Sequence, residues 1–224
     1  MAFILNINTA FETAVVSVSN DNEIVNELQS STQKEHASFL EPAIKSICEI
    51  SNIKLNDIDA ISVINGPGSY TGLRIGLASA KALCYALNKS LILLNTLDVM
   101  AYALRLQSVL QQQHLLFCPM IDARRMEVYT ALYDSDLHLK KKYSSEIIDE
   151  NFLEDERKRN VIVAGGKGSL KFQEIINDKT VTYINQLSLL KPSAILSNSA
   201  FICKQFSDVA YCEPFYLKPV YFRK

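Results

Sequence analysis

Short apolar runs alternate with longer stretches of helical periodicity along this chain, and Gly, Pro, Asn and Asp residues separate them. The first three runs predict short strands at residues 3–9, 13–19 and 23–29. A tight turn at residues 20–22 joins the last two. Helices are predicted over about residues 33–50, 71–88 and 96–113, and further strands at residues 60–65 and 91–95. This alternation of strands and helices indicates an α/β fold.

Two local features qualify these helices. Pro42 lies within the first helix and either bends it or marks its first turn. Thr96 is the predicted N-cap of the third helix, because its hydroxyl can accept a hydrogen bond from a free backbone N–H.

A glycine-rich turn between strand 60–65 and helix 71–88 is the most informative segment. It comprises Gly66, Pro67, Gly68, Ser69, Tyr70, Thr71, Gly72 and Arg74. Gly66 and Gly68 tolerate positive φ, and Pro67 stiffens the turn between them. Ser69 or Thr71 can cap the following helix. The spacing is neither G-x-G-x-x-G nor that of a phosphate-binding P-loop, because no Lys follows the last glycine.

The helix after this turn carries small residues on one side. Gly72, Gly76 and Ala80 recur every fourth residue, so they lie along one face where another helix could approach closely. An internal core helix and a subunit interface both fit this pattern, and we favour the interface. The predicted contact residues, from this helix and the first one, are Leu40, Ile44, Ile47, Gly72, Leu73, Gly76, Leu77, Ala80, Leu83, Cys84 and Leu87.

Composition narrows the function. The 224 residues are 48% hydrophobic with a net charge of −1, so the chain is globular and does not grip nucleic acid unaided by neutralising phosphates. Residues 140–142 and 223–224 are basic and are interpreted as a solvated strand edge and a frayed end. The five cysteines contain no C-x-x-C pair and there is no long apolar span, so we expect a cytoplasmic protein with reduced thiols and no membrane contact.

The chain contains an internal duplication. Residues 7–9 and 15–20 match residues 121–123 and 129–134 at an offset of 114, and residues 61–69 match 161–169 at an offset of 100. The second connector, residues 146–160, is therefore shorter by 14 residues, about one helix. Two lobes are predicted, residues 1–110 and residues 111–224.

Residues 66–76 resemble the signature of the TsaB (YeaZ) subfamily of the Kae1/TsaD family. Further matches are Phe3 to Thr9, His36, Asp122-Ala123-Arg124 with Glu127-Val128-Tyr129, and Tyr216-Leu217. The resemblance implies an actin/Hsp70/sugar-kinase-like (ASKHA) fold, a duplicated ribonuclease-H-like architecture in two lobes. It also implies a non-catalytic subunit that binds TsaD as a heterodimer and supports threonylcarbamoyl transfer to an adenosine of tRNA. The ATPase TsaE would contact the TsaB–TsaD pair, and tRNA would be reached only through the complex. Without TsaD, the small-residue face would form a homodimer.

The resemblance also raises the question of a nucleotide site. Relatives commonly carry Asp where this chain has Asn8, and an amide cannot supply a carboxylate's charge to a hard cation. A degenerate nucleotide site would comprise Asn8, Thr9, Asp122, Gly165, Gly166 and Gly168. Asp122 is interpreted as structural, pairing with Arg124 or Arg125, and the second glycine run as a close-packed turn.

No cofactor or metal is expected. His36 lacks a second histidine three or four residues away and is interpreted as a packing or capping residue. His114 and His138 are predicted to stand alone without an acidic or cysteine partner. Ser69 lacks the G-x-S-x-G context of a nucleophile. A glycoprotease-type metallopeptidase and a nucleotide-dependent kinase or ATPase remain as alternatives to the accessory subunit.

Overall fold

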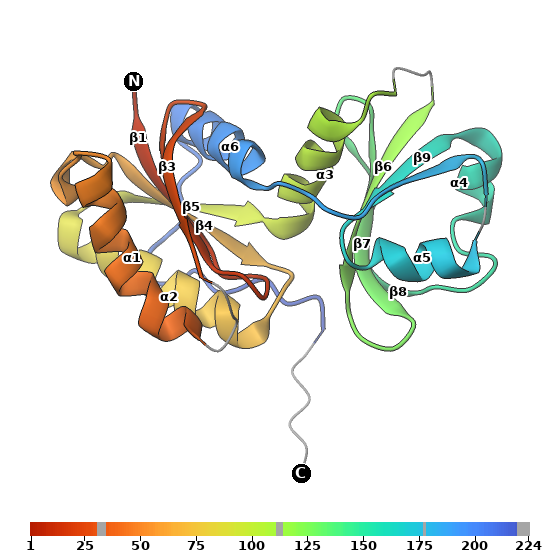
Figure 1. Cartoon of the computed structure of the whole chain (residues 1–224), viewed down its shortest axis with the longest axis horizontal. Coiled ribbons are helices and arrows are strands. Elements are labelled where there is room, and N and C mark those ends of the chain that lie inside the picture. Colours follow the sequence, from red (N-terminus) through yellow and green to blue (C-terminus); the bar gives the residue numbers. More distant parts are fainter. Residues whose placement is uncertain (31–34, 111–113, 177, 219–224) are drawn as a thin grey trace, which may run out of the picture. The chain divides into compact units, whose positions relative to one another are not determined.

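The computed structural model describes residues 1–30, 35–110, 114–176 and 178–218 (Figure 1). The chain forms two compact units, Met1–Thr96 with Leu190–Phe215, and Leu97–Leu189 with Tyr216–Lys224. This division differs from the predicted continuous lobes 1–110 and 111–224. Helix α6 (Leu190–Ile202) returns to the first unit because it packs against the first unit's sheet.

The first unit is a five-stranded sheet in the order β3-β2-β1-β4-β5. Its strands are β1 (Phe3–Asn8), β2 (Val15–Asn20), β3 (Glu23–Gln29), β4 (Ala60–Gly66) and β5 (Ser90–Asn95). β1 pairs antiparallel with β2 and parallel with β4. The predicted strands are confirmed, with ends shifted by at most two residues.

Strand alternation gives this sheet two different faces. Leu5, Ile7, Val16 and Val18 face α1 (His36–Ile50) and α2 (Tyr70–Leu87) in an apolar core. The opposite face carries polar side chains and is covered by α6. There the buried Asn6 Nδ2 donates to Ser19 Oγ at 3.0 Å. Asn198 of α6 donates to Asn22 Oδ1 at 2.9 Å.

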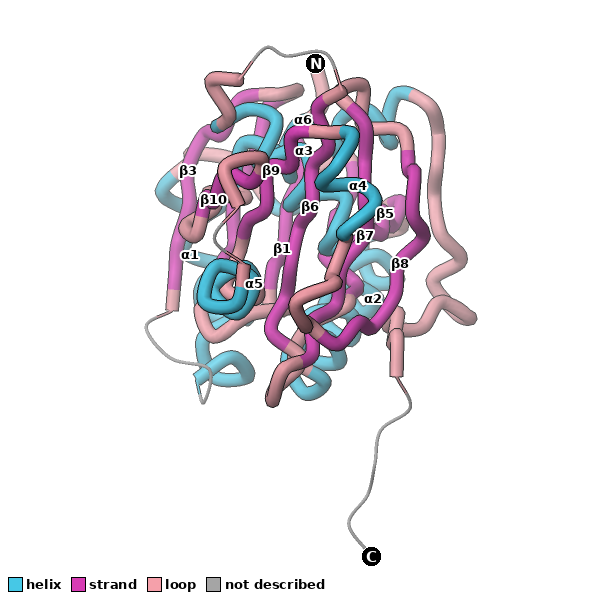
Figure 2. Tube along the Cα trace, turned by 90° about the vertical axis from the view of Figure 1, so that its right-hand side faces the viewer, coloured by secondary structure: helices cyan, strands magenta, loops and turns pink. Residues whose placement is uncertain are grey.

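The second unit repeats this plan in the sheet order β10-β9-β6-β7-β8, which Figure 2 shows in succession. Its strands are β6 (Leu115–Asp122), β7 (Glu127–Asp134), β8 (Leu139–Ile147), β9 (Val161–Gly165) and β10 (Val181–Ile184). Its helices are α3 (Thr96–Gln107), α4 (Glu154–Arg159) and α5 (Ser169–Ile175). β6 pairs with β7 and β9 as β1 pairs with β2 and β4.

The predicted duplication is therefore confirmed. Asn8 and Asp122 are the last residues of the matched strands β1 and β6, and Gly66 and Gly166 both have positive φ (124° and 95°). The shorter second connector contains the six-residue α4 where the first contains the 15-residue α1.

Several predicted helix ends differ. α3 ends at Gln107, and residues 111–113 of its predicted extension lie outside the described residues. Thr96 is the first residue of α3, but its buried hydroxyl makes no hydrogen bond within the described part of the chain, so the predicted cap is wrong. α1 begins at His36 and contains Pro42 within it, so Pro42 does not mark the first turn. The predicted start at residue 33 lies outside the described residues.

Among the described helices, none combines the length and apolar character needed to cross a bilayer. Five free thiols are present; those of Cys48, Cys84 and Cys118 are buried. Burial raises the pKa of the Cys84 and Cys118 thiols to about 12, which keeps them in the unreactive neutral form.

Candidate functional site

The glycine-rich turn connects β4 to α2 in the first unit. Ser69 is the N-cap of α2, and its hydroxyl accepts a hydrogen bond from the Gly72 N–H at 3.3 Å. The Ser69 N–H donates to Ala10 O at 2.8 Å and ties the turn to the segment after β1. The predicted Ser69 cap is confirmed. The guanidinium of Arg74 lies over the Tyr70 ring, 4.2 Å from its centroid.

The glycines of this turn make room for the chain's own backbone. Gly66 has a φ of 124°, and a Cβ there would overlap Phe215 O. A Cβ at Gly68 would lie 2.6 Å from Ala10 O. The close approach in this region is therefore intramolecular, and the space that a phosphate would occupy in a glycine cradle is filled by protein.

The start of α2 packs against the end of β1 in the same way. A Cβ at Gly72 would overlap the carbonyl oxygen of Thr9, and one at Gly76 would overlap Thr9 Oγ1. The Thr9 hydroxyl donates to Gly72 O at 2.7 Å. The small residues thus let Thr9, which is fully buried, lie directly on the helix backbone.

This arrangement corrects the predicted interface. Most of the residues assigned to partner contact are buried within the first unit: Leu40, Ile44, Ile47, Gly72, Leu73, Gly76, Leu77, Ala80 and Cys84. Leu83 and Leu87 are partly buried. A side chain enclosed by its own lobe cannot contact a second polypeptide, so the interface prediction is wrong for the buried residues. The alternative of a core-packed helix face is the correct one for this stripe.

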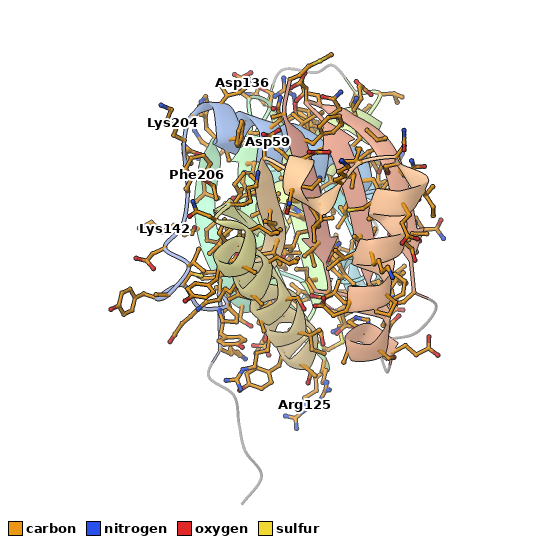
Figure 3. All side chains as sticks on the ribbon, turned by 90° about the vertical axis from the view of Figure 1, so that its left-hand side faces the viewer. Asp59, Arg125, Asp136, Lys142, Lys204 and Phe206 are labelled. Atoms are coloured by element: carbon orange, nitrogen blue, oxygen red, sulfur yellow. The ribbon has the colours of Figure 1, made fainter. Side chains whose placement is uncertain are left out.

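A different stripe of α2 is exposed (Figure 3). Ala78, Ala82 and Ala86 recur every fourth residue and are exposed, and the Tyr85 side chain beside them is 87% exposed. The neighbouring outer face of α1 is mostly charged, with Glu41, Lys45 and Glu49 among its exposed residues. The exposed apolar surface of this helix pair is therefore concentrated on α2.

The segment after α6 borders this stripe. Lys81 Nζ donates to Ala210 O at 3.0 Å and to Cys212 O at 3.1 Å. Tyr211 lies between these carbonyl groups in the sequence and is 85% exposed. Since Lys81 and Tyr85 are one helical turn apart on α2, Tyr85 and Tyr211 flank the same lysine.

Neither predicted half of a nucleotide site presents a carboxylate suited to a metal ion. In the first unit, Asn8 Oδ1 accepts from the Ala10 N–H at 3.1 Å. In the second, Asp122 Oδ1 accepts from Lys171 Nζ at 2.7 Å and from the Arg124 N–H at 2.6 Å. Burial opposes ionisation of Asp122, but the hydrogen bonds and charge of Lys171 outweigh it and lower the pKa of this carboxyl. Asp122 is structural as predicted, with Lys171 as its main partner.

The second glycine run is a close-packed turn, as predicted. Cβ atoms at Gly165 and Gly166 would lie 2.6 Å from the carbonyl oxygens of Ile184 and Met120. A Cβ at Gly168 would lie 2.9 Å from the Met120 carbonyl carbon. Ser169 Oγ donates to Gly166 O at 2.7 Å. These residues do not fit a metal-bound nucleotide, because each turn is filled by backbone and the Asp122 charge is compensated by a lysine.

The histidines divide into one confirmed and one corrected prediction. His36 is buried, with Nε2 2.9 Å from Phe11 O, which confirms the packing role. His138 was predicted to lack an acidic partner, but its Nδ1 lies 3.5 Å from Asp134 Oδ2, and Asp136 is close enough to complete a three-ligand group. The hairpin turn between β7 and β8 brings these residues together. The other Asp134 oxygen accepts the backbone N–H groups of Asp136 and His138, as in an ordinary capped turn.

Sequence reasoning missed a polar network in the second unit. Asp98 Oδ1 accepts from Tyr133 OH at 2.6 Å and from Tyr143 OH at 2.9 Å, which ties α3 to β7 and β8. Burial and the Asp98 charge raise the pKa of Tyr133 and raise that of Tyr143 to about 12. The three residues lie 10 and 35 positions apart, so no local motif reveals them.

Comparison with known proteins identifies the family. The model of a family described as "TsaD: tRNA N6-adenosine threonylcarbamoyltransferase" matches residues 23–213, most of the chain. The chain belongs to the Kae1/TsaD family. Its similarities to curated TsaB proteins and to YeaZ structures place it among the TsaB/YeaZ members of that family.

Three relatives within the Kae1/TsaD family illustrate the match. The TsaB biosynthesis proteins of Bacillus subtilis (strain 168) and Escherichia coli (strain K12) are 32% and 35% identical over 132 and 133 residues. These alignments cover 58% and 59% of this chain, and 54% and 55% of the relatives, so the chain spans about half the length of each. The tRNA N6-adenosine threonylcarbamoyltransferase of Wolbachia pipientis subsp. Culex pipiens (strain wPip) is 36% identical over 121 residues, 47% of this chain and 36% of that protein.

Solved structures support the fold predicted for the Kae1/TsaD family. A Pseudomonas aeruginosa protein with similarity to peptidase YeaZ matches 97% of this chain and all of its own, with a TM-score of 0.81 and 19% identity. The ethanolamine utilization protein EutJ of Carboxydothermus hydrogenoformans matches 87% of this chain and 90% of its own, with a TM-score of 0.54 and 8% identity. The two repeated α/β units therefore form a two-lobe ASKHA-type fold, as predicted.

We predict that Gly76→Ala destabilises the first unit. At an exposed helical position this change stabilises by about 1 kcal/mol, but here the new methyl group overlaps Thr9 Oγ1. The free energy of unfolding should fall by about 1–3 kcal/mol in urea titrations. Ala78→Ser, on the exposed side of the same helix, should change it by no more than about 0.5 kcal/mol. A more stable Gly76→Ala protein would contradict this packing.

We also predict that Lys171→Met raises the pKa of Asp122. The depressed pKa means that the ion pair stabilises the folded state above about pH 4, the ordinary Asp value, and that this stabilisation is lost as the pH falls through the folded-state value. A carboxyl-carbon NMR titration of Asp122 measures the change. Lys158→Met, which removes a lysine paired with Glu154, is the control and should leave the Asp122 titration unchanged.

Proposed function

We propose that this chain takes part in threonylcarbamoyladenosine biosynthesis in tRNA as an accessory subunit that binds a TsaD protein. The relatives named as TsaB biosynthesis proteins supply the process. The observation that carries the accessory role is the closed signature turn. Thr9, Ala10 and Phe215 fill the spaces beside its glycines, so this turn holds the lobe together and does not cradle a substrate.

The exposed stripe of α2 supports a helix-to-helix docking surface. Alanines four residues apart let a second helix approach closely, and Tyr85 supplies a large, rigid anchor of the kind enriched at interface centres. Arg74 and Lys81 flank the stripe and give it a basic border. A TsaD partner presenting an apolar helix with acidic residues at its margins fits this surface. In the absence of TsaD, two copies of the stripe form a homodimer.

The rest of the assembly follows from the same proposal. TsaE contacts the pair that this chain forms with TsaD, tRNA reaches the chain within that complex, and the complex works in the cytoplasm. The chain itself contributes no catalytic residue. Two observations count against the metallopeptidase and kinase alternatives: His36 is bound to a backbone carbonyl group, and Asp122 is bound to a lysine.

We predict that Ala82→Arg weakens the complex with TsaD at least about 100-fold, because a long charged side chain at the centre of a desolvated helix contact is left unpaired. The Tm should remain that of the parent, since Ala82 is exposed in the free chain. Isothermal titration measures the affinity. Ser199→Arg, an exposed position on α6 across the sheet, is the matched control and should bind TsaD normally.

Reconstitution tests the accessory role directly. With TsaD, TsaE, tRNA and threonylcarbamoyl donor present, omission of this chain should abolish threonylcarbamoyladenosine formation measured by mass spectrometry of digested tRNA. This chain with donor and tRNA but without TsaD should form none. Product from the chain alone would show that it is the enzyme and would refute the accessory role.

A further inference from the structure

We propose that the turn between β6 and β7, with the lysines around it, binds the phosphate backbone of RNA. The proposal depends on the proposed function only for the identity of the RNA as tRNA. It concerns the second unit, whereas the docking surface above belongs to the first. It also revises the interpretation of residues 140–142 and 223–224 as the chain's basic clusters.

The turn holds two consecutive arginines in an unfavourable backbone conformation. Arg124 and Arg125 have φ values of 69° and 49°, in the left-handed region that favours Gly, Asn and Asp. Hydrogen bonds from the Ala123 N–H to Glu127 O and from the Glu127 N–H to Arg124 O close the turn around them. Asn or Gly would adopt this backbone at lower cost, so the two guanidinium groups are retained despite it. Such strain is typical of functional positions.

Three lysines from other segments surround this turn. Lys171 of α5 donates to Asp122 Oδ1 and to Glu127 O, at 2.7 and 2.9 Å. Lys218, 91 residues after Glu127, pairs with the Glu127 carboxylate. Lys167 precedes Gly168, whose N–H donates to Met120 O at the end of β6. These contacts bring together five cationic side chains that are scattered through the sequence: Arg124, Arg125, Lys167, Lys171 and Lys218.

The cluster keeps an excess of positive charge. Its two carboxylates, Asp122 and Glu127, are each engaged by a lysine, and their pKa values are lowered, so both are ionised at neutral pH. Five cations around two anions leave a net charge of +3 in a chain whose total is −1. The nearby Glu146 pairs with Lys141 at 3.2 Å and does not offset this excess.

The shape of the site favours a polymer over a single nucleotide. Arg124 and Arg125 are exposed at the tip of a hairpin, and Figure 3 shows Arg125 extending away from the ribbon. The adjacent glycine turn is closed by backbone and provides no recess for a base. Guanidinium groups at a convex tip are suited to successive backbone phosphates, which they can bind in bidentate fashion.

The test is RNA binding by the full chain carrying Arg124→Asn and Arg125→Gly together. Both replacements accept positive φ, so the Tm should equal or exceed that of the parent. Fluorescence anisotropy with a tRNA transcript should give affinity about tenfold weaker at 50 mM salt, and a log Kd against log salt slope smaller by about 1.5. The matched control, Lys140→Asn with Lys142→Gly, removes the same charge from exposed positions of β8 and should bind tRNA like the parent.

The remaining arms separate the outcomes. ATP and inorganic phosphate, used as competitors at 1 mM (roughly the upper end of common ligand dissociation constants), should displace little tRNA; displacement by either would replace the RNA site by a small-anion site. Equal tRNA binding by the parent and the Arg124/Arg125 variant would overturn the proposal, as would equal weakening by the β8 control. TsaD binding by the same variant should be unchanged. Lost RNA binding without any TsaD binding by the parent would leave this inference standing and the proposed function refuted.

Discussion

The contact between Thr9 and the first two turns of α2 organises the first unit. Thr9 follows β1 directly, and its hydroxyl donates to Gly72 O while its carbonyl group lies against Gly72 itself. Strand and helix can be this close only where the helix has no Cβ, at Gly72 and Gly76. The same approach places Ala10 against Gly68 and leaves Ser69 free to cap the helix. One steric requirement thus accounts for most of the signature turn.

The two units apply this requirement to different ends. Each joins the last residue of its first strand to a glycine turn, and each turn is filled by backbone. In the first unit the turn leads into an 18-residue helix with a broad exposed side. In the second it leads into the seven-residue α5, whose Lys171 turns back toward Asp122. The duplicated plan therefore carries an apolar helix surface in one lobe and a cluster of cations in the other.

The surface available for docking depends on which side of α2 faces the sheet. A helix with small residues at positions 72, 76 and 80 and again at 78, 82 and 86 has two stripes suited to close packing. The first is used internally, by Thr9 and the core, and only the second reaches solvent. α6 makes a contrasting choice on the opposite face, where Asn6, Ser19 and Asn198 form a polar layer in place of an apolar one.

The sequence by itself determined the strands of the first unit, the turn and its Ser69 cap, the duplication at constant offsets, and the family. These follow from local periodicity, turn chemistry and repeated spacing, which neighbouring residues specify. Only the tertiary structure decided which glycine stripe is buried, that α6 returns to the first unit, and that His138 lies beside Asp134. It also decided that Lys171 and Lys218 join Arg124 and Arg125, and that Asp98 binds two distant tyrosines. Each of these is a contact between segments far apart in the chain, and neither periodicity nor spacing specifies which of several compatible surfaces will meet.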